Sequence, residues 1–98
     1  DKEMPVLALV PQDEVYQKSI SNVEEIKARQ GRIILIGTEG DSHLKNITDD
    51  VIYLPMVHEA MNPILYTIPA QLLSYEIASR RGCDVDQPRN LAKSVTVE

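Results

Sequence analysis

The sequence contains neither tryptophan nor phenylalanine, and Cys83 is its single cysteine. A core must therefore be built from Ile, Leu, Val, Ala and Met, which together with the other apolar residues make an ordinary aliphatic interior. One cysteine excludes an internal disulfide and fits a reducing compartment. We therefore expect a cytoplasmic protein with a single core, since 98 residues suffice for one domain and not for two.

Clustered basic residues and long apolar runs are also missing. Ten Lys and Arg stand against fifteen Asp and Glu, for a formal net charge of -5, and the cations are scattered along the chain. Binding to a phosphate backbone draws on clustered Lys and Arg, so no nucleic-acid partner is expected. No apolar run approaches the roughly 20 residues of a membrane span, and the opening Asp1, Lys2 and Glu3 are unlike a signal peptide, so no membrane association is expected.

The apolar residues that are present fall into segments with distinct periods. Residues 6–10, 33–36 and 51–54 are short apolar runs bounded by Pro, Gly or polar residues, which indicates strands, the first of them buried on both faces. Residues 13–30 show the three-to-four spacing of an amphipathic helix, with Asp13 as N-cap and Gly31 as its stop. Residues 42–50 are polar and predict no element.

A second helix is predicted over residues 62–81. Asn62 and Pro63 suit a helix start, Pro69 should bend or reset the axis, and Gly82 should close the helix after two arginines. The order strand, helix, strand, strand, helix predicts an α/β fold with three α-β-α layers around a parallel sheet. Residues 83–98 have no sustained period and predict an irregular C-terminal tail.

The spacing of the histidines and the cysteine does not indicate a metal site or an acid/base pair. His43, His58 and Cys83 are too far apart in sequence for a metal-ligand pattern, so no metal site is expected. His58 beside Glu59 could form a general acid/base pair, although a loop histidine at a helix entrance is the favoured interpretation.

Other polar pairs and turns have similarly simple interpretations. The segment from Gly37 to Ser42 follows a strand and could cradle a phosphate, but it lacks a Gly-rich fingerprint and carries two carboxylates, so a turn is predicted. Adjacent carboxylates point apart on a helix or strand, so the Glu24–Glu25 and Asp49–Asp50 pairs should be solvated surface. Tyr66 and Tyr75 on the last helix should lie in the core or in a subunit interface.

Three segments resemble one enzyme family. The tail DVDQPRNLAKSVTVE (residues 84–98) is similar to the C-terminus of the glucosamine-6-phosphate synthase family, also called glutamine:fructose-6-phosphate aminotransferase. NPILYTIPAQLLSY (residues 62–75) resembles the family's last helix, and NVEEIKAR (residues 22–29) an earlier one. The resemblance implies that residues 1–82 are the C-terminal part of the second sugar isomerase (SIS) domain, with a flavodoxin-like fold, and that residues 83–98 form a tail or lid.

The same resemblance implies a reaction and a set of residues. The family forms glucosamine 6-phosphate and glutamate from fructose 6-phosphate and glutamine, and Lys93 matches its catalytic lysine, which forms a Schiff base with the open-chain ketone. Ala92 would contact the sugar through its backbone. A second set would belong to the lid, namely Arg89, Asn90, Leu91, Ser94 and Val95. The resemblance implies no cofactor and a homo-oligomeric parent.

The family's glutaminase, its sugar-phosphate loop and its catalytic Glu and His match nothing in these 98 residues. We therefore expect the isolated chain to be inactive, because a lysine becomes a nucleophile only when a closed pocket lowers its pKa. The alternative interpretation is a phosphosugar-binding SIS regulatory module without catalysis. Such a module would have no need of a Schiff-base lysine at position 93.

Overall fold

The computed structural model describes residues 5–29 and 31–82, in which strands and helices alternate along the chain. The elements are β1 (Val6–Val10), α1 (Tyr16–Ala28), β2 (Ile33–Thr38), α2 (Leu44–Ile47), β3 (Val51–Leu54), the 3-10 turn η1 (Glu59–Met61) and α3 (Asn62–Arg80). Among residues 5–29 and 31–82, none of the helices combines the length and the hydropathy of a membrane-spanning segment. The predicted tail, residues 83–98, lies outside the described residues.

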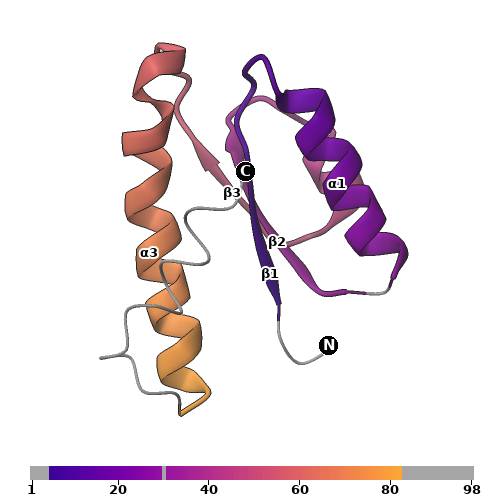
Figure 1. Cartoon of the computed structure of the whole chain (residues 1–98), viewed down its shortest axis with the longest axis vertical. Coiled ribbons are helices and arrows are strands. Elements are labelled where there is room, and N and C mark those ends of the chain that lie inside the picture. Colours follow the sequence, from indigo (N-terminus) through magenta and orange to yellow (C-terminus); the bar gives the residue numbers. More distant parts are fainter. Residues whose placement is uncertain (1–4, 30, 83–98) are drawn as a thin grey trace.

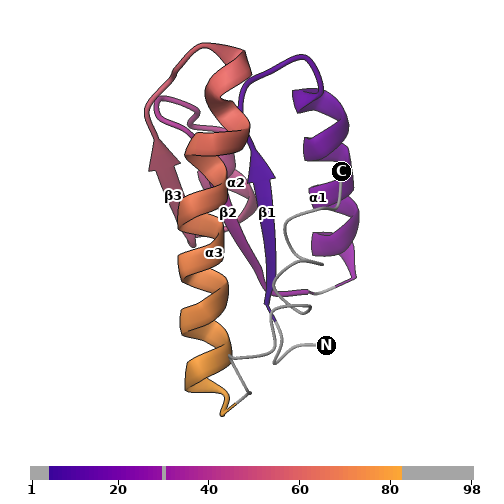
Figure 2. The ribbon, with the colours of Figure 1, turned by 60° about the vertical axis from the view of Figure 1, so that its left-hand side comes forward.

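The three strands form one parallel sheet in the order β1-β2-β3, as the sequence predicts. Val6 of β1 pairs with Ile33 of β2, and Leu35 of β2 pairs with Val51 of β3. Helix α1 covers one face of the sheet and α3 covers the other, which confirms the three-layer α-β-α arrangement (Figure 1). Helix α3 begins at the carboxyl end of the strands and runs back toward their amino ends (Figures 1 and 2).

The core is divided between the two faces of the sheet, and the halves are unequal. The α1 face holds seven buried apolar residues, with Val10, Leu35 and Leu44 fully enclosed. The α3 face holds only three, which are Ile36, Tyr66 and Ala70. In the described residues β1 pairs only with β2, so most of β1 stays partly exposed where the sequence predicted burial on both faces. An apolar run alone does not distinguish an edge strand from a central one.

The helix predicted over residues 13–30 begins later, at Tyr16, and ends at Ala28. Its predicted N-cap, Asp13, instead accepts hydrogen bonds from the amides of Val15 at Oδ1 (3.0 Å) and of Tyr16 at its backbone oxygen (3.1 Å). These two bonds make a separate turn that precedes the helix. Gly31 does close the helix, because its amide donates to the Ile26 carbonyl.

The segment between β2 and β3 differs from the prediction at two places. Gly37 and Thr38, predicted as turn, continue β2, and the turn itself is centred on Gly40, whose φ of +90° favours glycine. Helix α2 was not predicted, because Leu44 and Ile47 are the only apolar residues in a polar stretch. Both are buried against the α1 face of the sheet, so tertiary packing stabilises this single turn.

Helix α3 agrees with the prediction except at its start. Asn62 is its first residue and not its cap, because η1 precedes it and the side chain of His58 caps η1 by accepting from the Ala60 amide at 3.1 Å. The helix is continuous through Pro69 and ends at Arg80. Gly82 follows with a φ of +77°, the conformation of a glycine that closes a helix.

Gly37 is the position where the packing leaves no room for a side chain. A Cβ at this site would collide with Cδ1 of Leu44 and lie 3.2 Å from Cγ2 of Val10, and both neighbours are fully buried. We expect Gly37→Ala to lower the free energy of unfolding by about 1–3 kcal/mol, the usual cost of overpacking. Urea denaturation followed by circular dichroism measures the change.

The matched control for this prediction shortens the neighbour. Leu44→Ala alone removes buried apolar contacts, but it also opens the space that a Cβ at position 37 needs. The double variant Gly37→Ala/Leu44→Ala should therefore be less destabilised than the sum of the two single variants. Strict additivity would show that the two sites do not compete for the same volume.

Candidate functional site

Polar side chains gather where the strands end, at the carboxyl edge of the sheet. We call Tyr16, Thr38, Asp41, Tyr53 and Tyr66 the carboxyl-edge cluster. In open α/β sheets this edge is the usual place of a ligand site. Thr38 ends β2 and Asp41 lies in the turn after it, and both are buried.

Asp41 accepts hydrogen bonds at its carboxylate and at its backbone oxygen. The Tyr16 hydroxyl donates to Oδ2 at 2.6 Å, the His43 amide donates to Oδ1 at 3.2 Å, and the Tyr53 hydroxyl donates to the backbone oxygen at 3.0 Å. These bonds connect α1 with the β2–α2 turn through the Asp41 carboxylate, and β3 with the same turn through the Asp41 backbone oxygen. Asp41 therefore fixes the turn in place, and its oxygens have partners within the protein.

Thr38 and Tyr66 connect β2 with α3. Their hydroxyl oxygens share a hydrogen bond of 3.3 Å, and the Gln12 amide donates to Thr38 Oγ1 at 2.9 Å. Burial raises the pKa of Tyr66, so its hydroxyl is neutral at physiological pH. Among the described residues no buried side-chain nitrogen or oxygen lacks a hydrogen-bond partner. The cluster thus stabilises the edge and leaves no free buried group directed at a ligand.

The pKa of Tyr16 is raised from 10.0 to about 12, first by burial and then by the hydrogen bond and negative charge of Asp41. Because the fold favours the neutral phenol, its contribution to stability is complete below pH 10 and is lost as the pH rises toward 12. An ultraviolet titration of the tyrosines should show one hydroxyl ionising near pH 12, and Tyr16→Phe should remove it.

Asp41→Asn is the control for the cause of this shift. It removes the carboxylate but not the burial, so the pKa of Tyr16 should fall and still lie above 10.0. A Tyr16 transition that stays in place in this variant would contradict the assignment of part of the shift to Asp41.

A second candidate lies at the opposite, amino edge of the sheet. A depression of about 450 Å³ is bordered by Lys27, Arg32, Lys45, Asp49 and Asp50. Three cations around a hollow could suggest an anion site, but two carboxylates lie among them. The formal charge of this border is therefore only +1, from three cations and two anions.

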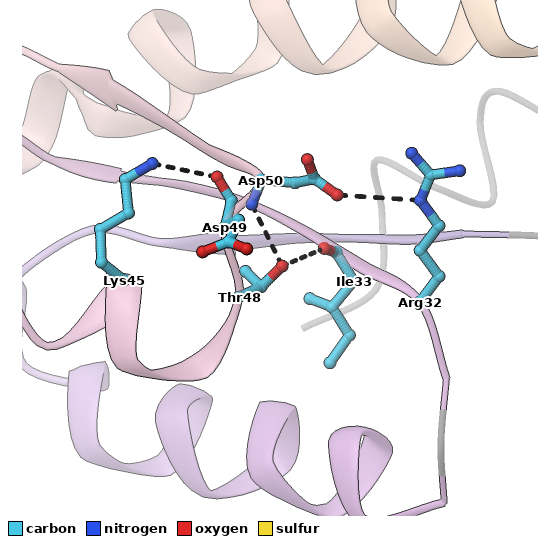
Figure 3. Close-up of polar contacts among 6 residues, drawn as sticks. All are labelled: Arg32, Ile33, Lys45, Thr48, Asp49 and Asp50. Carbon is cyan, nitrogen blue, oxygen red and sulfur yellow. Dashed lines mark hydrogen bonds and ion pairs between the residues drawn. The ribbon is translucent and has the colours of Figure 1, made fainter.

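Figure 3 shows that most of these groups contact one another. Lys45 Nζ donates to the backbone oxygen of Asp49 at 3.0 Å, and Arg32 Nε lies 3.7 Å from Asp50 Oδ2. Thr48 Oγ1 donates to the Ile33 carbonyl at 3.1 Å and accepts from the Asp50 amide at 3.2 Å. These contacts connect the start of β3 with the start of β2. Most of the charged groups that border the depression therefore have partners within the protein, and no ligand is needed to explain their arrangement.

The remaining candidates from the sequence lie on the surface of the described part. Glu24 Oε2 is 3.7 Å from His43 Nε2, and Glu24 and Glu25 are both exposed. His58 binds a backbone amide through Nδ1, so the local contact favours its interpretation as a loop histidine. Within residues 5–29 and 31–82 no group of three His, Cys, Asp or Glu side chains could hold a metal ion.

All the site residues taken from the family resemblance lie outside the described residues. These are Arg89, Asn90, Leu91, Ala92, Lys93, Ser94 and Val95. The structure does place the end of α3, from which the tail continues, near the amino edge of the sheet (Figure 1). Sequence reasoning missed the carboxyl-edge cluster, because Tyr16 and Tyr66 were read as apolar helix residues and Tyr53 as part of an apolar strand. A tyrosine on an apolar helix face carries a hydroxyl that needs a partner, and that signal could have indicated it.

Comparison with known proteins identifies the kind of domain. The chain is similar to the glutamine–fructose-6-phosphate aminotransferases [isomerizing] of Chlorobaculum tepidum (53% identity over 98 residues), Thermus thermophilus (52% over 98) and Aquifex aeolicus (53% over 98). Each similarity covers 100% of this chain, but only 16%, 16% and 17% of the respective relative. The chain thus spans about a sixth of the length of these curated relatives.

A protein-family model provides a second match, independent of the individual relatives. The family model of the SIS domain matches residues 1–79, which include every strand and almost all of α3. The chain therefore belongs to the SIS domain family.

Proposed function

We propose that this chain is the C-terminal part of the isomerase half of a glutamine:fructose-6-phosphate aminotransferase. The observation that carries the proposal is the similarity of 52–53% to enzymes of that name, which extends over all 98 residues and so includes residues 83–98. In this proposal residues 1–82 complete the second SIS domain, and residues 83–98 are the tail that closes over the sugar.

In the proposed mechanism Lys93 attacks the open-chain ketone of fructose 6-phosphate. The neutral amine adds to the carbonyl carbon and water leaves to give an imine. Ammonia released from glutamine then displaces the Lys93 amine from that carbon, and proton transfer at the neighbouring carbon of the resulting sugar imine gives the amino sugar. A lysine with an ordinary pKa of about 10.4 is neutral in roughly one molecule in 2,500 at pH 7. The mechanism therefore requires the pKa of Lys93 to be lowered, by exclusion of water or by a nearby cation such as Arg89.

The position of α3 is compatible with this role. The helix has 19 residues and so spans about 28 Å along the sheet, from the carboxyl edge to the amino edge. Eleven peptide units separate Gly82 from Lys93, and an extended chain of that length reaches roughly 36–40 Å. A lysine on such a tether can serve a sugar at either edge of the sheet or on a neighbouring domain.

The carboxyl-edge cluster also bears on the proposal, because it offers no alternative catalytic group. Its hydroxyls and its carboxylate bind one another, and the Tyr16 hydroxyl, which donates to the Asp41 carboxylate, has a raised pKa and is therefore a poor nucleophile. The described part is therefore best explained as a scaffold, and the chemistry is assigned to the tail. Ala92 would contact the sugar, and Arg89, Asn90, Leu91, Ser94 and Val95 would form the lid.

The compartment and the oligomeric state of the enzyme are also proposed. We assign it to the cytoplasm, which the single cysteine supports, and to a homo-oligomer, which is supported by the pairing of β1 on one side only within the described residues. The isolated chain should be inactive, because a glutaminase and the sugar-phosphate loop would lie in other parts of the polypeptide.

The test is turnover by the full-length protein that contains this chain. With glutamine and fructose 6-phosphate it should form glucosamine 6-phosphate and glutamate in equal amounts, while the 98-residue chain alone should form neither. Binding of the sugar phosphate without any product would favour the non-catalytic regulatory module instead. Product formed by the 98-residue chain alone would contradict the assignment of the sugar-phosphate loop to a missing region.

A further inference from the structure

Two glycines of the described part have a backbone conformation that other residues rarely adopt. Gly40 has a φ of +90° in the turn after β2, and Gly82 has a φ of +77° directly after α3. A Cβ at either position would meet no heavy atom of the described residues within 4 Å. Packing within the described part therefore leaves room for a side chain at both positions, and the positive φ is the reason that glycine is favoured there.

The positive φ of Gly82 ends α3. The Arg81 amide donates to the Ile77 carbonyl at 3.1 Å, and the Gly82 amide donates to the Ser79 carbonyl at 3.1 Å. A residue with a helical φ at position 82 would add to the helix and carry the chain onward along its axis. A residue in the left-handed conformation instead turns the following chain away from that axis. Gly82 therefore determines the direction in which the polypeptide leaves α3.

This exit direction is defined relative to the sheet, because α3 is anchored to it. Tyr66 and Ala70 are buried against the sheet, and the hydroxyls of Tyr66 and Thr38 share a hydrogen bond. The helix is continuous from there to its end near the amino edge (Figures 1 and 2). The eleven peptide units from Gly82 to Lys93 reach roughly 36–40 Å when extended, whereas the 19-residue helix spans about 28 Å. The length of this tether therefore does not select where Lys93 acts, and another feature must set its direction.

We propose that Gly82 is a positioning residue for the reaction assigned to Lys93, because its left-handed conformation directs residues 83–98 toward the sugar. This inference rests on the proposed function, and it adds a residue to which the family resemblance gave no role. Gly82 acts through its backbone alone and touches no reacting atom. A side chain that disfavours a positive φ would lower the fraction of molecules whose tail is directed at the sugar, and kcat would fall with that fraction.

The experiment compares substitutions at position 82 in the full-length protein. The left-handed region costs a residue with a Cβ about 1–2 kcal/mol, which corresponds to a factor of about 5–30 in population. Gly82→Val should therefore lower kcat about five- to thirtyfold. Gly82→Asn should keep kcat within about twofold of the unsubstituted protein, because asparagine adopts a positive φ more readily. The yield of the borohydride adduct with fructose 6-phosphate on Lys93 should fall in the same order.

Gly40→Val is the matched control for this experiment. It places the same side chain at the other positive φ, where a Cβ also has open space, in a turn at the opposite edge of the sheet. It should lower the free energy of unfolding about as much as Gly82→Val does, yet leave kcat within about twofold of the unsubstituted protein. Urea denaturation followed by circular dichroism compares the stabilities. If Gly82→Val does not fold, Gly82→Ala provides the same comparison without a β-branched side chain.

Three results would overturn the inference. Equal kcat values in Gly82→Val and Gly40→Val would show that the tail does not depend on the conformation at position 82. Equal losses in Gly82→Asn and Gly82→Val would show that glycine is required there for a reason other than its positive φ. An unsubstituted protein that forms no product rejects the proposed function and this inference with it, whereas product formation that is insensitive to Gly82→Val rejects the inference alone.

Discussion

Replacing Lys93 by alanine in the full-length protein is expected to abolish synthesis of glucosamine 6-phosphate while sugar-phosphate binding persists. Without the amine no imine forms, and the loss should reach at least about a thousandfold in kcat, as expected when a covalent route is removed. Turnover is measured with saturating glutamine and fructose 6-phosphate, and binding of glucosamine 6-phosphate by calorimetry.

Lys93→Arg is the matched variant for this prediction. It keeps a positive charge of similar reach but has no accessible neutral form, so it should be as inactive as Lys93→Ala. Substantial activity in the arginine variant would indicate that position 93 contributes charge and not a nucleophile. Unchanged turnover in both variants would remove the basis for assigning the chemistry to the tail.

Leu35→Ala is expected to have the largest effect on the fold. Leu35 is fully buried at the centre of β2, where it pairs with Ala8 on one side and Val51 on the other. Removing a buried leucine side chain costs about 2–5 kcal/mol from lost burial and the cavity that remains. Since small domains are stable by only about 5–15 kcal/mol, the variant should lose a large part of its stability and unfold at a clearly lower urea concentration.

The same substitution at an exposed position provides the control. Leu72→Ala in the 98-residue chain changes a side chain that is 67% exposed, so the free energy of unfolding should change by less than about 0.5 kcal/mol. Urea denaturation followed by circular dichroism compares the two variants. Equal destabilisation would show that Leu72 is buried in the chain in solution and would contradict its exposed position.

The sequence predicts the strands better than it predicts where they end. Ile33 to Ile36 are apolar throughout and therefore predict a strand, whereas its position between β1 and β3 is known only from the structure. Gly37 and Thr38 were predicted as turn because both residue types are common in turns. In the fold Gly37 continues the strand, since Val10 and Leu44 approach it too closely for a side chain. That approach depends on partners far away in sequence.

Helix α2 and the start of α1 were missed for a related reason. Leu44 and Ile47 are two apolar residues among polar neighbours, and only their burial against the sheet makes a helical turn there favourable. At α1, Asp13 has the chemistry of a cap, but its carboxylate is used in a preceding turn. Capping preferences predict that a helix starts nearby and do not determine which of two turns uses the side chain.

The candidate site residues also differ in how far the sequence could predict them. The family resemblance alone assigns a role to Lys93, and that assignment remains a proposal because the residue lies outside the described part. The carboxyl-edge cluster emerges only in three dimensions, since Tyr16, Thr38 and Tyr66 come from three separate elements. Tyr66 and Tyr75 were both predicted to lie in the core or in a subunit interface, and in the fold Tyr66 is buried whereas Tyr75 is 49% exposed.

The most direct measurement is reductive trapping of the sugar on the full-length protein. Borohydride added in the presence of fructose 6-phosphate reduces an imine to a stable amine, and peptide mass spectrometry locates the adduct. We predict the adduct on Lys93, and no adduct on the 98-residue chain treated alone. An adduct on a different lysine, or no adduct in a protein that turns over, would contradict the assignment of the chemistry to Lys93.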